Sequence, residues 1–384
     1  MALLKFFERF RGTLVLLSLM APIALLTPQA LFAQHYIQNN LVSSFPGIGT
    51  NPTNPRDTDF INAWGLTRSV TSPWWVSDNG TGLSTLYNGA GTKQGLVVTI
   101  PVPNNQTPPS TPTGVVSNST TDFHLANGSP ARFIFVTEGG TIAGWNGGST
   151  ATIVADNSRS GAVYKGCTIA ELDGKHYLYV ANFHSGEIEV YNASFQRVRL
   201  QGNAFVRDDS NDGHDAAFNG NPSHFAPFNV QAIGTNIYVS YAKQDADKHD
   251  EEAGSGLGDL AVFDPSGRRL ASMQRGSWFN APWGIAMAPG EFGEFSHALL
   301  VGMFGSGQIA AFNPISGTFL GLMKSPNDTL LSIDGLWALG FGAGNTNSGP
   351  YNTLYFTAGP HDERDGLFGN LVPIPAELIE ADEP

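Results

Sequence analysis

The chain has 384 residues, of which 41% are hydrophobic and only 14% are charged, with 45 glycines, 24 prolines and one cysteine. This composition excludes an intrinsically disordered chain, a helical bundle, and a small scaffold held by disulfides. The net charge of -13 argues against a nucleic-acid partner, because phosphate binding requires clustered Lys and Arg.

Residues 1–33 have the pattern of a secretory signal peptide. A basic start is followed by an apolar run, and the small residue Ala33 precedes the expected cleavage point. The apolar run is shorter than the roughly 20 residues that a transmembrane helix needs. We therefore expect a secreted or periplasmic protein with no membrane span after signal cleavage, one folded domain at residues 34–376 and a polar tail at residues 377–384.

A short pattern recurs along the rest of the chain. A Gly is followed five residues later by an aromatic residue and then by Asn or Asp, with alternating side chains between them. This spacing predicts a strand that begins at a Gly turn and ends at an Asx turn. Because a second β-rich run precedes each copy, each copy predicts a hairpin. The copies begin at Gly82, Gly140, Gly186, Gly258 and Gly307, and a sixth hairpin keeps the strands but not the aromatic-Asn pair.

A second pattern, a Gly (Asn in the fourth unit) followed by an apolar residue, opens each repeat unit at intervals of 49 to 63 residues. Together with the hairpin and a weaker last run, it predicts four strands per unit. The opening triplets are Trp64-Gly65-Leu66, Thr113-Gly114-Val115, Lys165-Gly166-Cys167, Phe228-Asn229-Val230, Trp283-Gly284-Ile285 and Asp334-Gly335-Leu336.

Six such units predict an all-β protein, a six-bladed β-propeller of four-stranded antiparallel blades. An array of β-sandwiches is the alternative, but sandwiches lack this self-similarity at unit length. An open ring would expose two sheet edges. The sixth unit lacks a clear fourth strand, whereas Tyr36–Val42 is a strand without a partner in its own unit. We therefore predict that this N-terminal strand of the mature chain closes the ring.

Several segments resemble known propellers. The strand starts PTGVV and APWGIA are similar to those of NHL-type and gluconolactonase-type six-bladed propellers. The segments YKGC, NFHSGEIEVY, FAPFN, YAKQDADKHDEEAG, NAPWGIA, DGLWALGFG and YFTAGPHDE resemble a family of exported bacterial proteins without an assigned activity. This second resemblance spans residues 40–372. It implies the propeller fold and an export route, and it provides no catalytic residues.

The face where first strands begin and second strands end is the predicted functional face. It surrounds the central channel, and ligand sites favour concave mouths built from several elements. We expect a monomeric binding protein that recognises a small molecule, a glycan or a protein there, with aromatic side chains stacking on sugars or apolar groups. The predicted ligand-binding residues are Trp64, Lys165, His184, Phe228, Lys243, Asp245, Trp283 and His361.

Carboxylate and amide oxygens on the same face suggest a divalent metal, because Ca²⁺ prefers such ligands. The resemblance to gluconolactonase-type propellers implies a Glu, Asn and Asp set whose metal polarises a lactone carbonyl. By type and approximate place, the metal candidates are Glu138, Asn182, Asn229 and Asp334. A hydrolase or lactonase dependent on Ca, Mg or Zn is therefore the alternative function. In the other interpretation, these groups only cap strands and bind channel water. Whether the protein is an enzyme stays open, because a fold alone does not imply an activity.

Two long loops overhang this face. Residues 201–226 contain RDDSNDGHD, which matches the first half of a calcium loop, but Asn219 stands where a bidentate Glu is expected, which favours a solvated loop. Residues 243–258 contain the acidic run KQDADKHDEE, which either binds a metal or cationic ligand or simply faces water. Cys167 lies inside a predicted strand and is expected to be a small buried residue, not a nucleophile.

Overall fold

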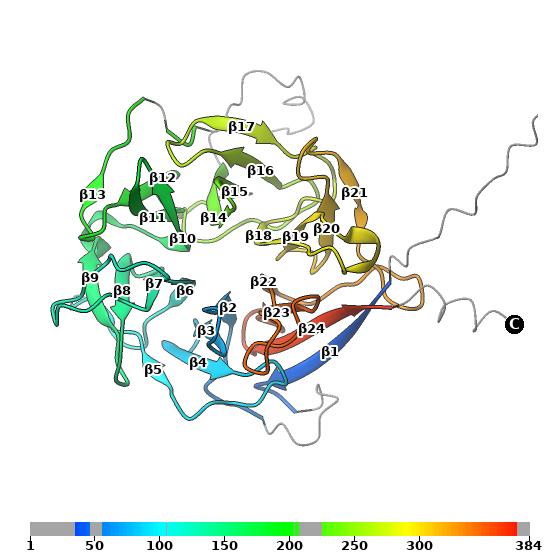
Figure 1. Cartoon of the computed structure of the whole chain (residues 1–384), viewed down its shortest axis with the longest axis horizontal. Coiled ribbons are helices and arrows are strands. Elements are labelled where there is room, and N and C mark those ends of the chain that lie inside the picture. Colours follow the sequence, from blue (N-terminus) through cyan, green and yellow to red (C-terminus); the bar gives the residue numbers. More distant parts are fainter. Residues whose placement is uncertain (1–34, 47–55, 105, 203, 207–224, 375–384) are drawn as a thin grey trace, which may run out of the picture. The chain divides into compact units, whose positions relative to one another are not determined.

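Six four-stranded antiparallel sheets surround a central axis, as the sequence predicts (Figure 1). The computed structural model describes residues 35–46, 56–104, 106–202, 204–206 and 225–374, which all belong to one compact unit. The predicted signal peptide, the polar tail and the possible calcium loop at RDDSNDGHD lie outside the described residues. Short 3-10 turns occur at Ser158–Ser160 and Gly293–Phe295.

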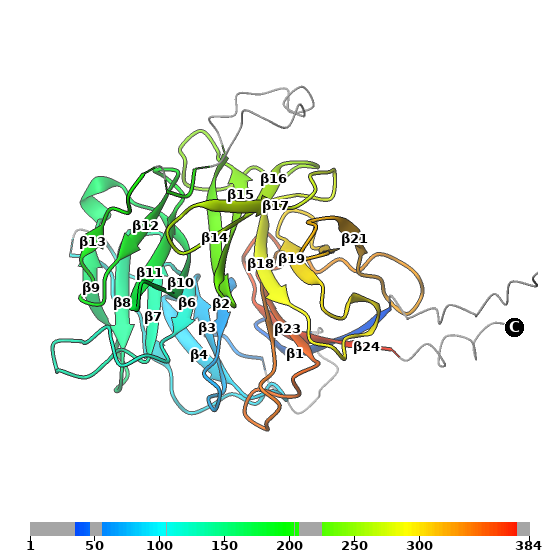
Figure 2. The same cartoon turned by 45° about the horizontal axis from the view of Figure 1, so that its top comes forward.

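Within each blade the strands follow one another from the axis outward, and the first strands of adjacent blades lie side by side around the axis. Figure 2 shows the third and fourth blades next to each other. Blades one to three consist of β2 (Ala63–Thr67), β3 (Trp74–Asp78), β4 (Leu83–Tyr87) and β5 (Val98–Thr99); β6 (Pro112–Ser117), β7 (Phe133–Thr137), β8 (Thr141–Trp145) and β9 (Thr152–Asp156); and β10 (Tyr164–Leu172), β11 (Lys175–Asn182), β12 (Glu187–Tyr191) and β13 (Arg197–Val198). Blades four and five consist of β14 (Phe225–Ile233), β15 (Asn236–Lys243), β16 (Gly258–Phe263) and β17 (Arg269–Ser272); and β18 (Pro282–Met287), β19 (Leu299–Met303), β20 (Ile309–Phe312) and β21 (Phe319–Leu322).

The sixth blade combines the two ends of the folded chain. It contains β22 (Leu336–Phe341), β23 (Leu354–Ala358), β24 (Leu367–Pro373) and, as its outer strand, β1 (Tyr36–Ser43). β1 pairs antiparallel with β24, which is visible as the blue strand beside the red one in Figure 1. That this pairing is what holds the ring closed stays a prediction.

The hydrophobic core is divided by the blades. Six clusters of buried side chains each fill the space between two adjacent blades, and a seventh lies on the axis. Each strand of a blade alternates its side chains between the two neighbouring spaces, which explains why second strands such as β3, β7 and β19 are buried along their whole length. Each large apolar side chain buried in this way contributes roughly 1.5–3 kcal/mol, which offsets the entropy of ordering the chain.

Each innermost strand carries a β-bulge at the same place, where its pairing with the second strand shifts register. A bulge bends a strand and redirects a side chain. The residues at this position are Trp64, Thr113, Lys165, Phe228, Trp283 and Trp337. In the sixth blade the shift lies between Leu336 and Leu339, so the predicted opening at Asp334-Gly335-Leu336 is wrong, and the equivalent triplet is Trp337-Ala338-Leu339.

A cavity of about 20 Å³ lies on the axis, lined by residues of all six innermost strands. A space of this size holds about one water molecule. Cys167 contributes to its wall and is buried, as predicted, and burial raises the pKa of its thiol. Among the described innermost strands, the space at this level of the axis is therefore about the size of one water molecule.

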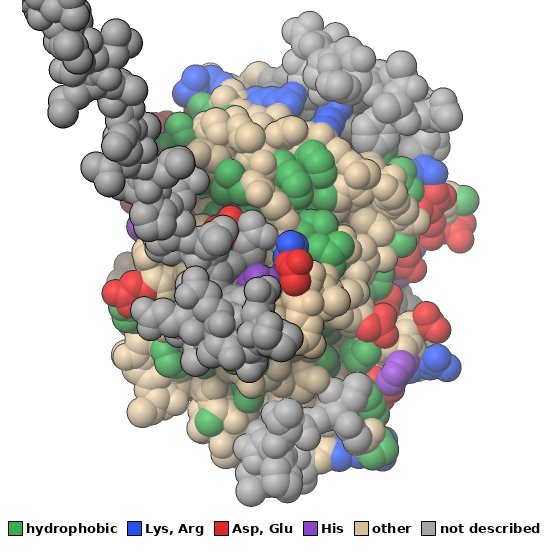
Figure 3. Space-filling model, turned by 90° about the vertical axis from the view of Figure 1, so that its right-hand side faces the viewer, with side chains coloured by type: hydrophobic (Ala, Val, Ile, Leu, Met, Phe, Trp, Pro, Cys, Tyr) green, Lys and Arg blue, Asp and Glu red, His purple; other side chains and the backbone are tan. Residues whose placement is uncertain are grey.

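The outer surface over the fifth and sixth blades is poor in charge. Figure 3 shows this side, on which uncharged and hydrophobic side chains predominate, with a small group of basic, acidic and histidine side chains near the centre and several acidic groups along one edge. Ile315, Leu320 and Leu330 are among the exposed large apolar residues of these blades. The charge density of the surface thus follows the low charge content of the sequence.

Candidate functional site

Aromatic side chains close the axis at the predicted functional face. Trp64 stacks on Trp337 with ring centroids 3.5 Å apart, and Trp283 meets both rings edge-on. Phe228 packs against the same two rings, and Phe304 stacks on Trp337. These residues, together with Phe183, form the aromatic plug: Trp64, Phe183, Phe228, Trp283, Phe304 and Trp337.

The plug corrects the expectation of an exposed stacking surface. Trp64, Phe228 and Trp283 lie beside the axis as predicted, but they are only 2%, 0% and 4% exposed. Their faces contact one another, because the unpredicted Trp337 fills the space between them. A sugar or apolar ligand therefore finds no exposed face of Trp64, Phe228 or Trp283 on which to stack.

Lys165 is a buried charged residue whose ammonium lies against the aromatic plug. Its side chain is fully buried, and its ammonium lies 4.8 Å from the centroid of the Trp64 ring. Nζ donates to Glu138 Oε1 at 2.6 Å and to Asp250 Oδ1 at 3.0 Å. A buried ammonium is costly unless it is paired and hydrogen-bonded, so these two carboxylates and the ring compensate for its burial.

Four blades supply the groups around Lys165. The lysine stands at the bulge of β10, Glu138 directly follows β7, and Asp250 comes from the loop between β15 and β16. A fourth group, Glu363, lies in the loop between β23 and β24. Each of these positions is on the face where second strands end, which explains how residues far apart in sequence meet.

Two asparagines of the first blade connect these acids. Asn79 donates to Glu138 Oε2 at 2.9 Å, and Asn62 donates to Asn79 Oδ1 at 3.3 Å and to Glu363 Oε2 at 2.5 Å. The carbonyl oxygen of the Asn62 side chain accepts a hydrogen bond from Trp337 Nε1 at 3.0 Å. The asparagines therefore fix the carboxylates relative to the plug.

We call the set Glu138, His249, Asp250, Glu251 and Glu363 around Lys165 the acidic mouth. Burial raises the pKa of Glu251 to about 8, and the nearby negative charges of Glu363 and Asp250 act in the same direction. Burial also raises the pKa of Glu363, with help from Glu138 and Asp250. Four carboxyl groups thus surround one ammonium and one imidazole, and that of Glu251 is mostly protonated at neutral pH.

The cationic groups of the mouth respond in the opposite way. Burial alone would lower the pKa of Lys165, but Glu138, Glu251 and Asp250 raise it, so the lysine stays charged. The hydrogen bond from His249 Nδ1 to Asp250 at 3.0 Å raises the pKa of the imidazole. For Asp250, burial is outweighed by His249 and Lys165, which together lower the pKa of its carboxyl.

Three of the four predicted metal ligands make hydrogen bonds to other groups of the protein. Asn182 donates to Glu189 Oε1 at 2.9 Å inside the third blade, and Asn229 donates to the carbonyl oxygen of Trp283 at 2.7 Å in the next blade. Asp334 is exposed and accepts the backbone N–H of His361 at 2.8 Å, because it precedes the bulge and does not occupy it. Asn182, Asn229 and Asp334 thus each bond a group other than Glu138, and a metal held by the four residues stays a prediction. A different trio, Glu138, His249 and Asp250, has possible ligand atoms within 4.8 Å of one another.

The remaining predicted residues surround the mouth without entering it. Lys243 pairs with Glu252, and Asp245 accepts the backbone N–H of His249 at 2.9 Å, so both hold the loop that carries Asp250. His184 is half-buried. His361 is exposed and bonds Asp365 at 2.9 Å. Sequence reasoning missed Glu363, although the run HDERD, directly after a second strand, could have indicated it.

Asp78 occupies, in the first blade, the place that Asn182 occupies in the third. Each ends its second strand and pairs with the residue before its own bulge. The Asp78 side chain is fully buried and accepts the N–H of Thr85 at 2.8 Å. Burial raises the pKa of its carboxyl well above the usual range; the charge of Asp57 adds to this, whereas Thr85 and Lys93 oppose it.

We therefore expect Asp78→Asn to stabilise the protein at neutral pH. The raised folded-state pKa means that the wild type keeps its full stability below about pH 4 and loses up to about 1.4 kcal/mol per pH unit as the pH rises toward that pKa. Asparagine removes this loss and retains an acceptor for Thr85. Urea unfolding at pH 4, 6 and 8 measures the difference. Asp362→Asn, at a side chain that is 96% exposed, should leave the slope unchanged. A variant less stable than wild type at pH 8 would contradict the assignment.

Comparisons with known proteins give the family but no activity. No protein-family model matches the chain. Uncharacterized protein L690 of Acanthamoeba polyphaga mimivirus is 31% identical over 327 residues, which cover 82% of this chain and 81% of the relative. Uncharacterized protein R648 of the same virus is 29% identical over 331 residues, covering 84% and 77%. These relatives are viral, whereas the sequence resemblance pointed to exported bacterial proteins.

A solved structure supports the architecture. The GH93 alpha-L-arabinofuranosidase of Fusarium graminearum, solved with arabinobiose, has a TM-score of 0.52 at 12% identity and covers 88% of this chain and 98% of that one. A likeness of this size shows the fold alone. Among the residues that the structure describes, no helix is long and apolar enough to span a membrane. By its identity to L690 over most of both chains, the protein belongs to the family of that mimivirus protein, and its fold is a six-bladed β-propeller.

Proposed function

We propose that the protein is a binding module that takes up a positively charged group in the acidic mouth. The observation that carries this proposal is the excess of acidic groups: four carboxyl groups surround one buried ammonium and one imidazole. A bound cation would stabilise the ionised forms of Glu251 and Glu363, whose pKa values are raised by burial in its absence. The ligand class is an ammonium or guanidinium group on a small molecule or on a protein side chain.

Two other features support this ligand class. The whole chain has a net charge of -13, which attracts cations over distances beyond direct contact. The buried aromatic plug removes the stacking surface that favoured glycans or apolar ligands. The signal-peptide pattern of residues 1–33 supports a secreted or periplasmic location, which together with a monomeric state is part of the proposal.

Binding of arginine amide and of its neutral analogue citrulline amide tests the proposal. We expect calorimetry at low ionic strength to detect arginine amide only, because just this probe carries the guanidinium charge. Glu363→Gln should weaken its affinity by roughly tenfold, the loss of one favourable charge interaction of about 1.4 kcal/mol. The exposed Asp362→Asn is the matched control. Equal affinity for both probes, or no effect of Glu363→Gln, would reject a cation site at the mouth.

A metal-dependent hydrolase or lactonase is the second candidate. The trio Glu138, His249 and Asp250 favours it, because carboxylate and imidazole groups bind divalent metals. Thermal unfolding with Ca²⁺, Mg²⁺ and Zn²⁺, together with elemental analysis, separates the candidates. If the protein is purified without metal and its melting temperature is the same with and without each of the three ions, the hydrolase is excluded.

A further inference from the structure

We propose that Lys165 is a tethered cation that keeps divalent metal ions out of the acidic mouth, and that its removal converts the mouth into a metal site. The inference deepens the proposed function, because it concerns the same mouth and names the residue that selects an organic cation over a metal. Nζ lies 2.6 Å from Glu138 and 3.0 Å from Asp250, which belong to different blades.

The ammonium occupies the space that a metal would need. Glu138, His249 and Asp250 each offer a ligand atom, and these atoms lie within 4.8 Å of one another. Divalent ions contact such ligands at about 2.0–2.6 Å, so a metal shared by the trio would overlap the position of Nζ. The cluster already contains a cation, and this cation is part of the protein.

Lys165 cannot easily leave this place. Its side chain is fully buried, and its ammonium lies 4.8 Å from the Trp64 ring centroid and 5.8 Å from that of Phe183. A metal ion would have to displace this buried ammonium, and it would then face its positive charge. Both costs oppose metal binding in the wild type.

The carboxylates are held by contacts that do not involve Lys165. Asn79 bonds Glu138 Oε2, and the backbone N–H of Glu138 donates to the carbonyl of Thr111. Within the loop, the N–H of Asp245 donates to the carbonyl of Asp250 at 2.8 Å. Two further bonds anchor this loop: Gln244 Nε2 to the carbonyl of Phe183, and the N–H of Gly254 to Asn280 Oδ1. Without the lysine, the two carboxylates should therefore stay together with no cation between them.

Lys165→Met in the full chain tests this inference, with Mn²⁺ as the probe. Methionine keeps the apolar stem over Trp64 and removes the charge. We expect the variant to bind Mn²⁺ at least roughly tenfold more tightly than the wild type, by calorimetry and by loss of the free-ion paramagnetic resonance signal. Its melting temperature should rise with added Mn²⁺. Lys243→Met, at a half-buried lysine paired with Glu252 on the same loop, should gain no affinity.

The double variant Glu138→Gln with Lys165→Met provides the second measurement. It removes one carboxylate with the ammonium, so it should fold without metal and bind Mn²⁺ no better than the wild type. If Lys165→Met alone fails to fold, refolding in the presence of Mn²⁺ should recover it. The inference is overturned by a folded Lys165→Met that gains no Mn²⁺ affinity, by equally tight Mn²⁺ binding in the wild type, or by failed recovery with Mn²⁺ while the double variant folds. Arginine amide binding to the wild type reports on the proposed function separately.

Discussion

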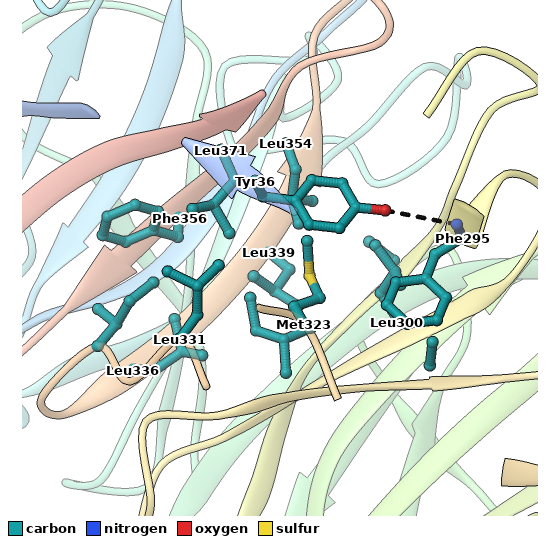
Figure 4. Close-up of a cluster of buried hydrophobic side chains, with 14 of the residues drawn as sticks. Tyr36, Phe295, Leu300, Met323, Leu331, Leu336, Leu339, Leu354, Phe356 and Leu371 are labelled. Atoms are coloured by element: carbon teal, nitrogen blue, oxygen red, sulfur yellow. Dashed lines mark hydrogen bonds between the residues drawn. The ribbon is translucent and has the colours of Figure 1, made fainter. Parts of the chain in front are cut away.

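Replacing Tyr36 with alanine is expected to lower the free energy of unfolding by about 3–5 kcal/mol, the range found when large aromatic side chains are removed from a core. Tyr36 begins β1 and is fully buried. Its ring lies 4.8 Å from that of Phe292 and stacks on Phe295 at 6.1 Å, and its hydroxyl donates to the carbonyl of Phe292 at 3.0 Å. Figure 4 shows the ring and hydroxyl directed at the Phe295 segment of the fifth blade, while β1 itself completes the sixth. One side chain thus links the N-terminal strand to two blades.

Urea unfolding followed by tryptophan fluorescence measures this effect. Ile37→Ala is the matched control, because Ile37 lies next to Tyr36 in the same strand but is 40% exposed. Its removal should cost less than about 1 kcal/mol. If the two variants lose the same free energy of unfolding, the contacts of β1 with the fifth blade contribute little, and β1 does not hold the ring closed.

The propeller could be predicted because its local chemistry repeats. Asn88 and Asn192 end third strands, and each side-chain oxygen accepts two backbone N–H groups from the turn that follows. Asp264 and Asn313 do the same in the fourth and fifth blades. These Asx turns depend only on residues close in sequence. A pattern that recurs with the unit length therefore reveals the blade without knowledge of tertiary contacts.

The sixth blade shows where such pattern matching fails. Asp334-Gly335-Leu336 has the expected form, but Gly335 lies before the strand with a φ of 64°. The residue that follows the bulge position is Ala338, so the true triplet lacks the glycine that marks four of the other five units. Because the predicted triplet lies three residues before the true one, Asp334 was assigned to the bulge position that Trp337 occupies. Because Trp337 is the ring that buries Trp64, the same error produced the expectation of an open aromatic rim.

The acidic mouth could be predicted only in part. Position in the repeat placed Lys165 and Glu138 beside the channel, and composition singled out the loop that carries Asp250. The contact between Asp250 and Lys165 depends on the path of that loop across a blade boundary, which no local pattern encodes. Glu363 reaches the mouth from the sixth blade through Asn62 in the same way. Sequence reasoning therefore identified the correct face but not which side chains turn inward.

Replacing Gly65 with alanine should destabilise the protein by about 3 kcal/mol or more, at the upper end of the cost of overpacking a core. A Cβ at Gly65 would lie 2.4 Å from the carbonyl oxygen of Thr113 and 2.9 Å from the backbone nitrogen of Val115. Both atoms are backbone of the neighbouring innermost strand, so no side-chain rotation relieves the contact. Gly95→Ala is the control, because a Cβ there meets no atom within 4 Å, and its effect should stay within about 0.5 kcal/mol. Urea unfolding of both variants decides whether adjacent blades pack at the axis as closely as the structure places them. Equal stability would mean that the innermost strands can separate at little cost, and the mouth above them would then lack a rigid base.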